Sequence, residues 1–320
     1  MIVWIDDEIF NGEVSSVELI SFLRAAAVRR HTLLISDSLY FGWGRNYPNY
    51  FKWLHSLSLS LQKELELIRA RYEIVSSNSV SYSGKVRFYI SSRICLIDRE
   101  ICRLSLSDAI RSMSLPLHIL VENQINDGRF LRSLLPPIWR ERFEQWERTG
   151  ELRFVQGGGN SEIARLIEYH KDDDNCRSAF GLPSKVWAMV HFVIYDHDGE
   201  RIEQPGEGAK KLDRLCEKYV SHHRLARRTQ ESYLPIKILE IIADRRIQNP
   251  KERNDFQKKL DEFSGLGVQR YFSKLPQLGV KPFFKNEFSN LPKEWSDELV
   301  EEDDVWAEMT ALAEEIASRI

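Results

Sequence analysis

The feature of this sequence that most constrains its fold is a regular alternation of apolar strands and helical segments that begins at Leu117. Three apolar runs, LHILVE, ELRFVQ and VWAMVHFVIYDHDGE, are separated by stretches with helical periodicity. The third run is apolar over most of its length, which is typical of a strand buried on both faces. Alternating strands and helices are the pattern of a parallel sheet with crossover helices, so the sequence predicts an α/β fold here.

Acids or glycines follow each predicted strand at its carboxyl end. Glu122 follows the first strand, Gly157 to Gly159 follow the second, and Asp196 and Asp198 follow the third. Ligands of such sheets bind beside the carboxyl ends of the strands, so these residues are expected to share one site. Two neighbouring carboxylates repel each other, and a hard cation such as Mg²⁺ relieves that repulsion while it takes oxygen ligands. Glycines let the backbone approach an anion or turn into a helix N-terminus, which favours phosphate.

Each of these features alone has a structural interpretation. Asp198 followed by Gly199 is common in turns, and the glycine run can be a loop before Asn160 and Ser161, which are suited to capping the next helix. The three features together, in this order and each at a strand end, favour a metal site. His197 stands between the two aspartates, so its side chain is expected to point away from them, and it is not a predicted ligand.

Several of these segments resemble a known family. ILVEN, RFVQGGGNSEIARLI and HFVIYDHDGE are similar to the Toprim domain of topoisomerases, bacterial primases and OLD-type nucleases, in which a glutamate follows the first strand and a D-x-D follows the third. The segment HHRLARRTQESYLP resembles the part of OLD-like defence nucleases in which a basic strand precedes arginines, a glutamate and a tyrosine. The resemblance covers the chain from Leu117 to Pro235.

The resemblance implies phosphodiester hydrolysis that depends on a divalent cation, Mg²⁺ or Mn²⁺. The chain departs from the family at Asn123, where a glycine is usual, and at Asn126, where an acid is frequent and Asp127 stands one position further along. The metal ligands that the resemblance implies are Glu122, Asp127, Asp196, Asp198 and Glu231. The catalytic residues that it implies are Glu122, Asp196, Asp198, Glu231 and a lysine late in the domain, for which Lys285 is the candidate and Lys281 and Lys274 are alternatives.

A basic segment, His222 to Arg228, contains no acid. Because phosphate contacts give affinity without sequence preference, Arg224, Arg227 and Arg228 are the predicted nucleic-acid-binding residues. The alternative interpretation is an ordinary solvated basic edge.

Two classes of function are left open. The first is a metal-dependent endonuclease that acts on DNA or RNA and is, by resemblance, an effector of a bacterial anti-phage defence system. The second is a non-catalytic subunit with a Toprim fold that binds nucleic acid or an ATPase. No P-loop of the form G-x-x-x-x-G-K-S/T occurs in the sequence, so any ATP-driven step must come from another protein, such as an ATPase or another defence-system subunit. A primase-type transferase is a third hypothesis.

Three parts are expected along the chain: an N-terminal α/β or α+β domain over residues 1–115, a Toprim-like metal-binding core over 116–235, and a mostly helical extension over 236–320 that completes or caps the core. The last helix carries apolar residues at helical spacing, which predicts a core-facing side or, alternatively, a face for a partner. These residues are Val305, Met309, Leu312, Ile316 and Ile320.

The N-terminal part alternates the apolar runs MIVWI, HTLLIS, VRFYIS and ICLID with helical stretches. The first helix is expected to bury an apolar face made of Val17, Ile20, Leu23 and Ala27. Acids follow two of the runs, and this faintly resembles a PIN-like nuclease, although acids at strand ends are also common turn residues. These acids are Asp6, Asp7 and Asp37.

The composition and the net charge exclude several further classes of protein. The net charge of −3 excludes a simple cationic coat for nucleic acid. The four cysteines include no C-x-x-C pair, so reduced structural thiols are expected and a zinc site is not. The chain has no long apolar run, and its start, MIVWIDDEIF, has no signal-peptide pattern, so the sequence predicts a cytoplasmic protein without membrane contact.

Overall fold

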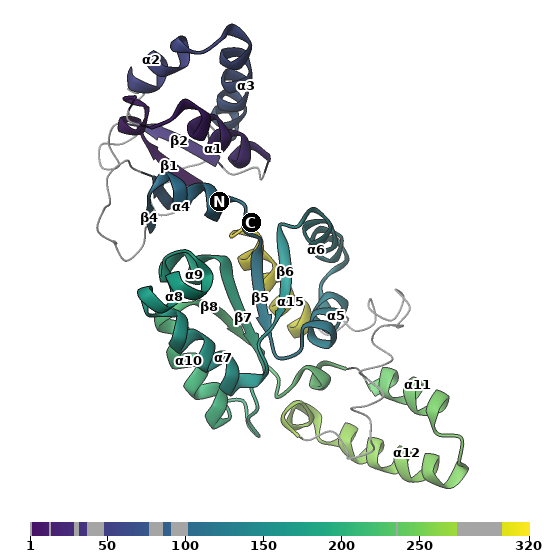
Figure 1. Ribbon diagram of the computed structural model, residues 1–320. Coiled ribbons are helices and arrows are strands. Elements are labelled where there is room, and N and C mark those ends of the chain that lie inside the picture. The colour runs from purple at the N-terminus through teal and green to yellow at the C-terminus, as the bar shows by residue number, and fades with distance from the viewer. Residues whose placement is uncertain are drawn as a thin grey trace. The chain divides into compact units, whose positions relative to one another are not determined.

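Two compact units make up this protein, each with its own four-stranded parallel sheet (Figure 1). The first unit is Met1–Leu115 with Phe180–Val186, and the second is Pro116–Ala179 with Trp187–Ile320. The computed structural model describes residues 2–12, 14–28, 32–36, 48–76, 86–90, 102–234, 236–273 and 303–320. The predicted α/β class is confirmed, with parallel sheets and a large helical content.

The sheet of the first unit has the strand order β2-β1-β3-β4. Its strands are β1 (Ile2–Asp6), β2 (Thr32–Ser36), β3 (Val86–Ile90) and β4 (Cys102–Leu104). The helices of this unit are η1 (Asp7–Phe10), α1 (Ser16–Val28), α2 (Pro48–Ser56), α3 (Leu59–Ser76) and α4 (Leu106–Met113). Three of the four predicted strands are confirmed; the fourth, ICLID, lies outside the described residues, and β4 follows it.

The buried face of α1 agrees with the predicted one only in part: Leu23 is buried as predicted, Ile20 is half-buried, and the side chain of Ala27 is not among the described ones. Leu19, Phe22 and Leu23 are buried, whereas Val17 is 72% exposed. Residues two positions apart lie on opposite sides of a helix with 3.6 residues per turn, so Val17 and Leu19 cannot both face the core. The prediction was therefore wrong at Val17, and the buried face of the helix is centred on Leu19, Phe22 and Leu23.

The second unit contains the predicted strand and helix alternation, with the strand order β6-β5-β7-β8. Its strands are β5 (Leu117–Val121), β6 (Leu152–Gln156), β7 (His191–Tyr195) and β8 (Ser221–Arg224), and all adjacent pairs are parallel. The helices between these strands are α5 (Gln124–Leu134), α6 (Pro137–Thr149), α7 (Gly159–His170), α8 (Asp173–Phe180), α9 (Ser184–Val190) and α10 (Glu207–Tyr219). Helix α6 ends at Gly150, whose φ of 72° is the left-handed conformation in which a glycine commonly ends a helix.

The third predicted strand of this alternation was too long. Its first part, up to Val190, belongs to α9, and only His191–Tyr195 forms β7. The buried residues of α9 are Val186, Trp187 and Val190, which have helical spacing. A short, fully buried apolar run does not reveal by periodicity whether it is helix or strand.

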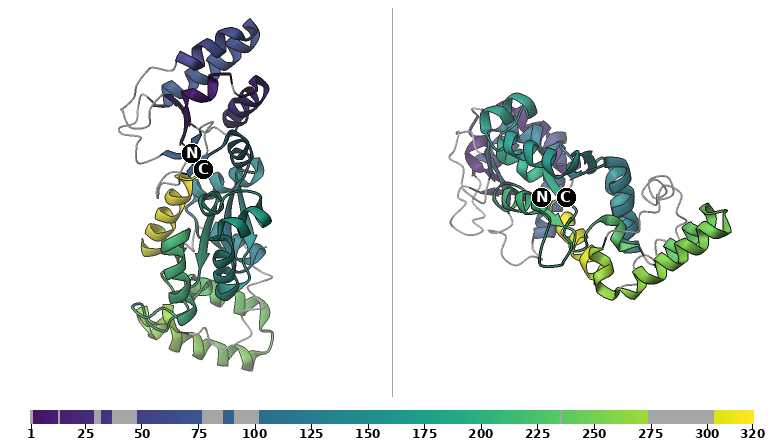
Figure 2. Two further views of the ribbon diagram at one scale, coloured as in Figure 1. Left: turned by 60° about the vertical axis from the view of Figure 1, so that its left-hand side comes forward. Right: turned by 90° about the horizontal axis from the view of Figure 1, so that it is seen from below.

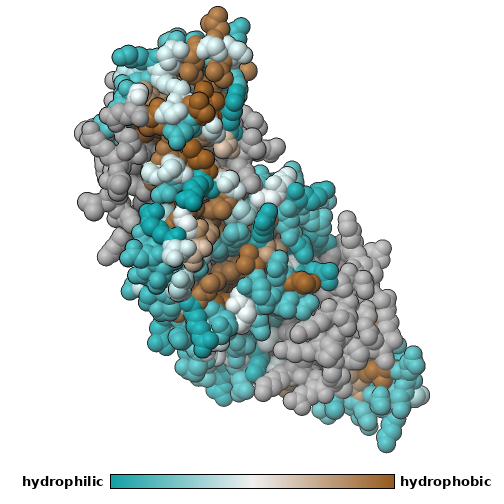
Figure 3. Space-filling model, viewed as in Figure 1, coloured by the Kyte–Doolittle hydropathy of each residue, from teal (hydrophilic) through white to brown (hydrophobic). Residues whose placement is uncertain are grey.

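Helices cover both faces of the second sheet (Figure 1). On one face, Ile119 of β5 and Ile194 of β7 pack in a core with Phe130 of α5 and Phe143 of α6. On the other face, α7 and α10 pack against each other, and α10 buries Ala209, Leu212 and Cys216. The outer surface of α10 is mainly hydrophilic (Figure 3), whereas its apolar residues are buried, as expected for an amphipathic helix.

After β8 the chain is mostly helical. It forms η2 (Gln230–Tyr233), α11 (Ile236–Arg246), α12 (Pro250–Gly265), η3 (Gly267–Phe272) and α15 (Asp303–Ala317). Helix α15 lies beside the sheet in the views of Figure 2. Its residues Val305, Met309, Leu312 and Ile316 are buried in the same core as α5 and α6, which confirms the core-facing interpretation.

Two smaller features of the described residues bear on the sequence predictions. Cys176 and Cys216 are buried free thiols, and burial raises their pKa to about 11 and about 12. They therefore stay protonated, which fits structural thiols. Within the described ranges, no helix combines the length and the apolar character that a bilayer crossing requires.

Candidate functional site

Glu122 and the two aspartates leave the second sheet at the same edge. Strands β5 and β7 are parallel neighbours, with Leu120 paired to Val193, so the residues that follow them emerge side by side. Strand β6, which the glycines follow, pairs with β5 on its other side. The three predicted features therefore meet at the carboxyl ends of adjacent strands, where parallel sheets place their ligands.

The three glycines form a tight turn between β6 and α7. Gly157 N donates to Val121 O at 2.7 Å, and Gly158 N donates to Glu122 O at 3.1 Å. Gly158 and Gly159 have φ values of 77° and 76°, a conformation that favours glycine. A Cβ on Gly159 would stand 3.9 Å from Glu122 Oε1, so the Glu122 carboxylate faces the start of α7.

Asn160 contacts the D-x-D instead of capping α7. The N-cap of α7 is Gly158, which makes no side-chain cap bond, and Asn160 lies inside the first turn. Its Nδ2 donates to Asp198 Oδ2 at 2.9 Å. The sequence prediction that Asn160 and Ser161 cap this helix was wrong, because the left-handed glycines already redirect the chain. Asn160 is a site residue that sequence reasoning missed, since its partner lies 38 residues away in the chain.

The two aspartates are held by the segment that follows β8. Asp196 Oδ1 accepts from Gln230 N at 3.2 Å. Asp198 N donates to Arg228 O at 2.8 Å. Asp198 has a φ of 56° and is the only described residue other than glycine with a positive φ. A strained backbone of this kind is frequent at functional sites, and Asp tolerates it better than most residues.

His197 is an internal residue between the two aspartates. Its ring is 2% exposed and packs edge-on against Phe272. Nδ1 accepts from Gly199 N at 3.1 Å, so Nε2 carries the proton and donates to Ile202 O at 3.0 Å. Burial lowers the pKa of His197, which keeps the ring neutral. Both ring nitrogens are engaged, as expected for a residue that is not a ligand.

Asp127 lies on α5 and is engaged with the start of its own helix. Its Oδ2 accepts from Asn123 N at 2.6 Å, while Asn123 Oδ1 accepts from Ile125 N at 3.2 Å and Asn126 N at 3.0 Å. This reciprocal arrangement satisfies donors at the N-terminus of α5. Asp127 therefore has a capping role in this structure, and the metal-ligand role that the family resemblance implied stays a prediction.

Several predicted site residues fall outside what the structure describes. The backbone of Glu231 lies in η2, but its side chain is not among the described ones. Lys274, Lys281 and Lys285 also lie outside the described residues. Among the side chains that are described, no three His, Cys, Asp or Glu residues form a group that could hold a metal ion.

The donor set still has a definite chemical character. Glu122, Asp196 and Asp198 are all carboxylates, and hard oxygen ligands suit Mg²⁺ and Mn²⁺ better than softer metals. His197 and the two described cysteines do not add nitrogen or sulfur donors, because the histidine is engaged and the thiols are buried. The residues present therefore fit a hard divalent cation by donor type.

The three predicted phosphate-binding arginines have protein partners. Arg224 forms an ion pair with Asp213, which also accepts from Tyr195 Oη. Arg228 Nη1 donates to Phe272 O at 3.0 Å. Arg227 is 3% exposed, and its guanidinium lies 3.6 Å from the centroid of the Tyr271 ring. Arg227 is therefore an internal packing residue and does not fit the surface phosphate contact that its sequence context suggested.

The acids of the first unit act as caps. Asp6 Oδ1 accepts from Glu8 N at 3.0 Å at the start of η1. Asp7 is 1% exposed, and its carboxylate accepts from Tyr50 N at 2.8 Å and Asn49 N at 2.9 Å. These bonds favour the structural interpretation of both residues. Asp37, the third acid of the PIN-like hypothesis, lies outside the described residues.

The candidate site thus consists of Glu122, the glycine turn, Asn160 and the aspartates Asp196 and Asp198. All are contributed by the second unit. Its architecture has an acidic edge, a helix N-terminus beside it and a strained aspartate at its centre. Comparison of the chain with protein-family models, with curated proteins and with solved structures finds no match.

Proposed function

We propose that this protein is a divalent-metal-dependent nuclease of the Toprim type, which hydrolyses phosphodiester bonds in DNA or RNA as an effector of a bacterial anti-phage defence system. The observation that carries the proposal is the arrangement of Glu122, Asp196 and Asp198, which follow adjacent parallel strands at one sheet edge. The glycine turn places the N-terminus of α7 beside this edge, where the helix dipole favours a phosphate.

Glu122, Asp196 and Asp198 would hold Mg²⁺ or Mn²⁺ through carboxylate oxygens, with Glu231 as a further ligand. When bound, the cation supplies charge stabilisation at the phosphate and lowers the pKa of a coordinated water. Asn160 orients Asp198 through its 2.9 Å hydrogen bond, and the Gln230 amide orients Asp196. Lys285 is retained as the proposed source of a positive charge at the phosphate.

A non-catalytic role is the second candidate, and one observation favours it. Both aspartates already accept hydrogen bonds from the protein, Asp196 from Gln230 and Asp198 from Asn160. Such bonds would suit a site kept for its shape, in a Toprim-like subunit that binds nucleic acid or an ATPase partner.

A cleavage assay separates the two candidates. Purified protein is incubated with supercoiled plasmid, single-stranded DNA and tRNA, each with Mg²⁺, Mn²⁺ or EDTA, with and without the proteins encoded beside it. We expect cleavage that EDTA abolishes and that Asp196→Asn removes. The matched control is Asp255→Asn, because Asp255 is an exposed acid on α12. Absence of cleavage under every condition would leave the non-catalytic role, whereas equal cleavage by Asp196→Asn would mean that the chemistry lies away from these carboxylates.

A further inference from the structure

We propose that Glu308, on the C-terminal helix α15, is a positioning residue for the aspartates Asp196 and Asp198. It acts through the segment between β8 and α11, Leu225–Leu234, which we call the bracket segment. The proposal deepens the proposed function and rests on it for its catalytic consequence, whereas the structural coupling is argued from contacts alone.

The Glu308 carboxylate accepts three hydrogen bonds from β8 and the bracket segment. Oε1 accepts from His223 Nε2 at 2.8 Å and from Ala226 N at 2.9 Å. Oε2 accepts from Tyr233 Oη at 2.7 Å. The Glu308 side chain is only 12% exposed, so these charge-assisted bonds form largely away from water. One carboxylate therefore ties the beginning and the end of the bracket segment to α15.

The position of Glu308 on α15 is fixed by the core. Glu308 lies three residues after Val305 and four before Leu312, so it shares the buried face of the helix. Val305 and Leu312 are 1% and 2% exposed. Burying a carboxylate costs desolvation free energy that its hydrogen bonds must offset. If this position served helix packing alone, an apolar residue would be sufficient. The carboxylate additionally holds its three hydrogen-bond donors in fixed positions.

The bracket segment is braced internally around Tyr233. Tyr233 is fully buried, and its phenol donates to Glu308 Oε2 at 2.7 Å. Its Oη also accepts from Arg227 N at 3.2 Å. The Arg227 guanidinium lies 5.0 Å from the centroid of the Tyr233 ring and 3.6 Å from that of Tyr271, and its Nη1 donates to Ser232 O at 3.2 Å. A displacement at Tyr233 is therefore transmitted to Arg227 and its neighbours.

The other side of the bracket segment holds the acidic pair. Leu225 N donates to Tyr195 O at 2.9 Å, which continues the pairing of β8 with β7 beyond the strand. Arg228 O then accepts from Asp198 N at 2.8 Å, and Gln230 N donates to Asp196 Oδ1 at 3.2 Å. Hydrogen bonds at both ends and the short stretch of backbone from Ala226 to Gln230 thus join Glu308 to both aspartates. Because a displacement of about 1 Å at a catalytic group can lower a rate about a hundredfold, this connection matters for chemistry.

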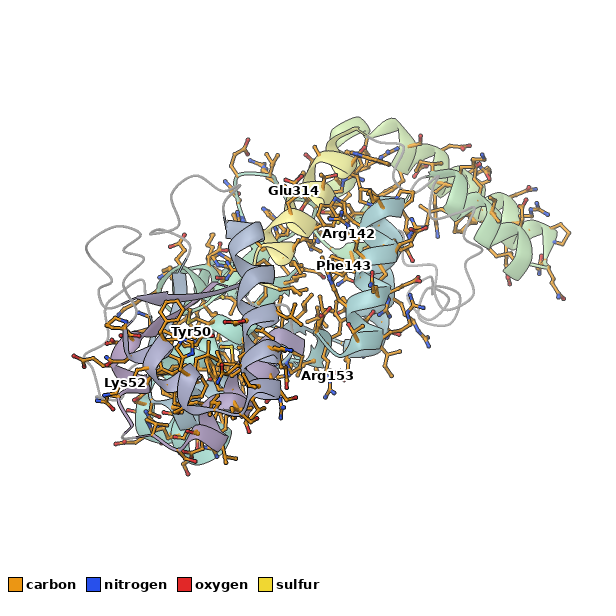
Figure 4. The ribbon with its side chains drawn as sticks, turned by 90° about the horizontal axis from the view of Figure 1, so that it is seen from above. Tyr50, Lys52, Arg142, Phe143, Arg153 and Glu314 are labelled. Carbon is orange, nitrogen blue, oxygen red and sulfur yellow. The ribbon has the colours of Figure 1, made fainter. Side chains whose placement is uncertain are left out.

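The test compares Glu308→Gln with Glu314→Gln in the full-length protein. Gln has nearly the shape of Glu but lacks its charge and its second acceptor oxygen. Glu314 is an exposed residue on the same helix, labelled in Figure 4, and serves as the matched control. Amide hydrogen exchange is measured over residues 196–199 and 225–234. We expect exchange at least about tenfold faster in Glu308→Gln, with β5 unchanged, and wild-type exchange in Glu314→Gln.

A second readout separates positioning from docking of the helix. Glu308→Gln is expected to lower kcat at least about tenfold with little change in KM, and to weaken Mn²⁺ binding measured by titration with the metal alone. Leu312→Ala is the structural control, since it loosens the packing of α15 without touching the carboxylate. At a temperature where it is folded, it should lower kcat and Mn²⁺ affinity less than Glu308→Gln does, because the carboxylate and its three donors are all retained.

The outcomes are distinct. Unchanged exchange over the bracket segment in Glu308→Gln would overturn the coupling, whatever the activity. Faster exchange with wild-type kcat and Mn²⁺ affinity would overturn the positioning role and leave Glu308 as a docking residue. If the wild-type protein neither cleaves nucleic acid nor binds Mn²⁺, the proposed nuclease function fails, and the exchange result alone decides whether Glu308 positions the aspartates.

Discussion

Glu122 is the residue on which the enzymatic hypothesis depends most directly. Its side chain is exposed at the end of β5 and faces the glycine turn at the start of α7. We expect Glu122→Gln to reduce cleavage by at least about a hundredfold, because the neutral amide cannot replace a carboxylate as a ligand or base. Melting temperature and nucleic-acid binding should stay at wild-type values. Glu144→Gln on α6 is the control, since Glu144 is equally exposed and remote from the sheet edge.

Asp127 provides a contrasting residue on the next helix. Its bond to Asn123 N makes it a capping residue, so Asp127→Asn should lower the free energy of unfolding by about 1 kcal/mol and leave cleavage nearly intact. If Glu122→Gln cleaves as well as the wild-type protein, or Asp127→Asn loses as much activity as Glu122→Gln, the assignment of ligands at this edge is wrong.

Gly199 gives a second prediction at the residue scale. A Cβ at this position would lie 2.0 Å from Gln204 O and 2.6 Å from His197 Cε1. Gly199→Ala must therefore distort the turn that follows Asp198, and we expect it to lower the free energy of unfolding by more than about 2 kcal/mol. Gly265→Ala at the end of α12 is the control, because a Cβ there meets nothing within 4 Å. Equal chemical-denaturation midpoints for the two variants would contradict the steric argument.

At the scale of elements, the amino-terminal ends of β5 and β7 carry a histidine pair, of which His191 is buried and His118 is half-buried. His191 Nδ1 donates to Trp187 O at 2.6 Å, so its Nε2 accepts from His118 Nδ1 at 3.2 Å. The His191 ring also stacks on Trp187, with centroids 4.3 Å apart. Burial lowers the pKa of His191 to about 3, and burial together with Arg153 lowers the pKa of His118.

This pair predicts acid sensitivity of the sheet. Between the unfolded-state pKa of about 6.5 and the folded-state value of about 3, the unfolded chain binds a proton at His191 that the folded chain does not. The free energy of unfolding should therefore fall as the pH drops through this window, by up to about 1.4 kcal/mol per pH unit for this residue. Urea unfolding of the wild type and His191→Asn at pH 7, 5 and 4 tests it. The variant should show the shallower dependence, and identical slopes would count against the prediction.

At the scale of the whole molecule, cation binding should appear as global stability. A cation that binds only the folded protein stabilises it by about 2.7 kcal/mol at a concentration one hundred times its Kd. We expect Mg²⁺ or Mn²⁺ to raise the melting temperature of the wild type and to have much less effect on Asp198→Asn. Asn is suited to the left-handed backbone at this position, where φ is 56°, so the variant should fold normally. Equal shifts in the wild type and Asp198→Asn would argue against a metal at this edge.

Local patterns in the sequence were sufficient for the class of fold and for several elements. Apolar runs predicted three of the four strands of the second unit, with helical stretches between them, although the first part of the third run belongs to α9. The fourth strand, β8, was expected only through the family resemblance. The buried face of α15 and the left-handed Gly150 were also predictable, because spacing and glycine conformation are properties of a few neighbouring residues. The placement of Glu122 and the D-x-D after strands followed from the same patterns.

Only the tertiary structure determines which of these residues lie close to one another in the folded protein. The strand order that makes β5 and β7 neighbours, the Asn160–Asp198 bond and the burial of Arg227 all depend on contacts between distant parts of the chain. Glu308 and Tyr233 are 75 residues apart, and no local propensity couples them. Periodicity reports which face of an element is apolar, whereas the partner of a polar side chain is determined by packing, since a buried donor or acceptor must find whatever group the fold brings within hydrogen-bonding distance.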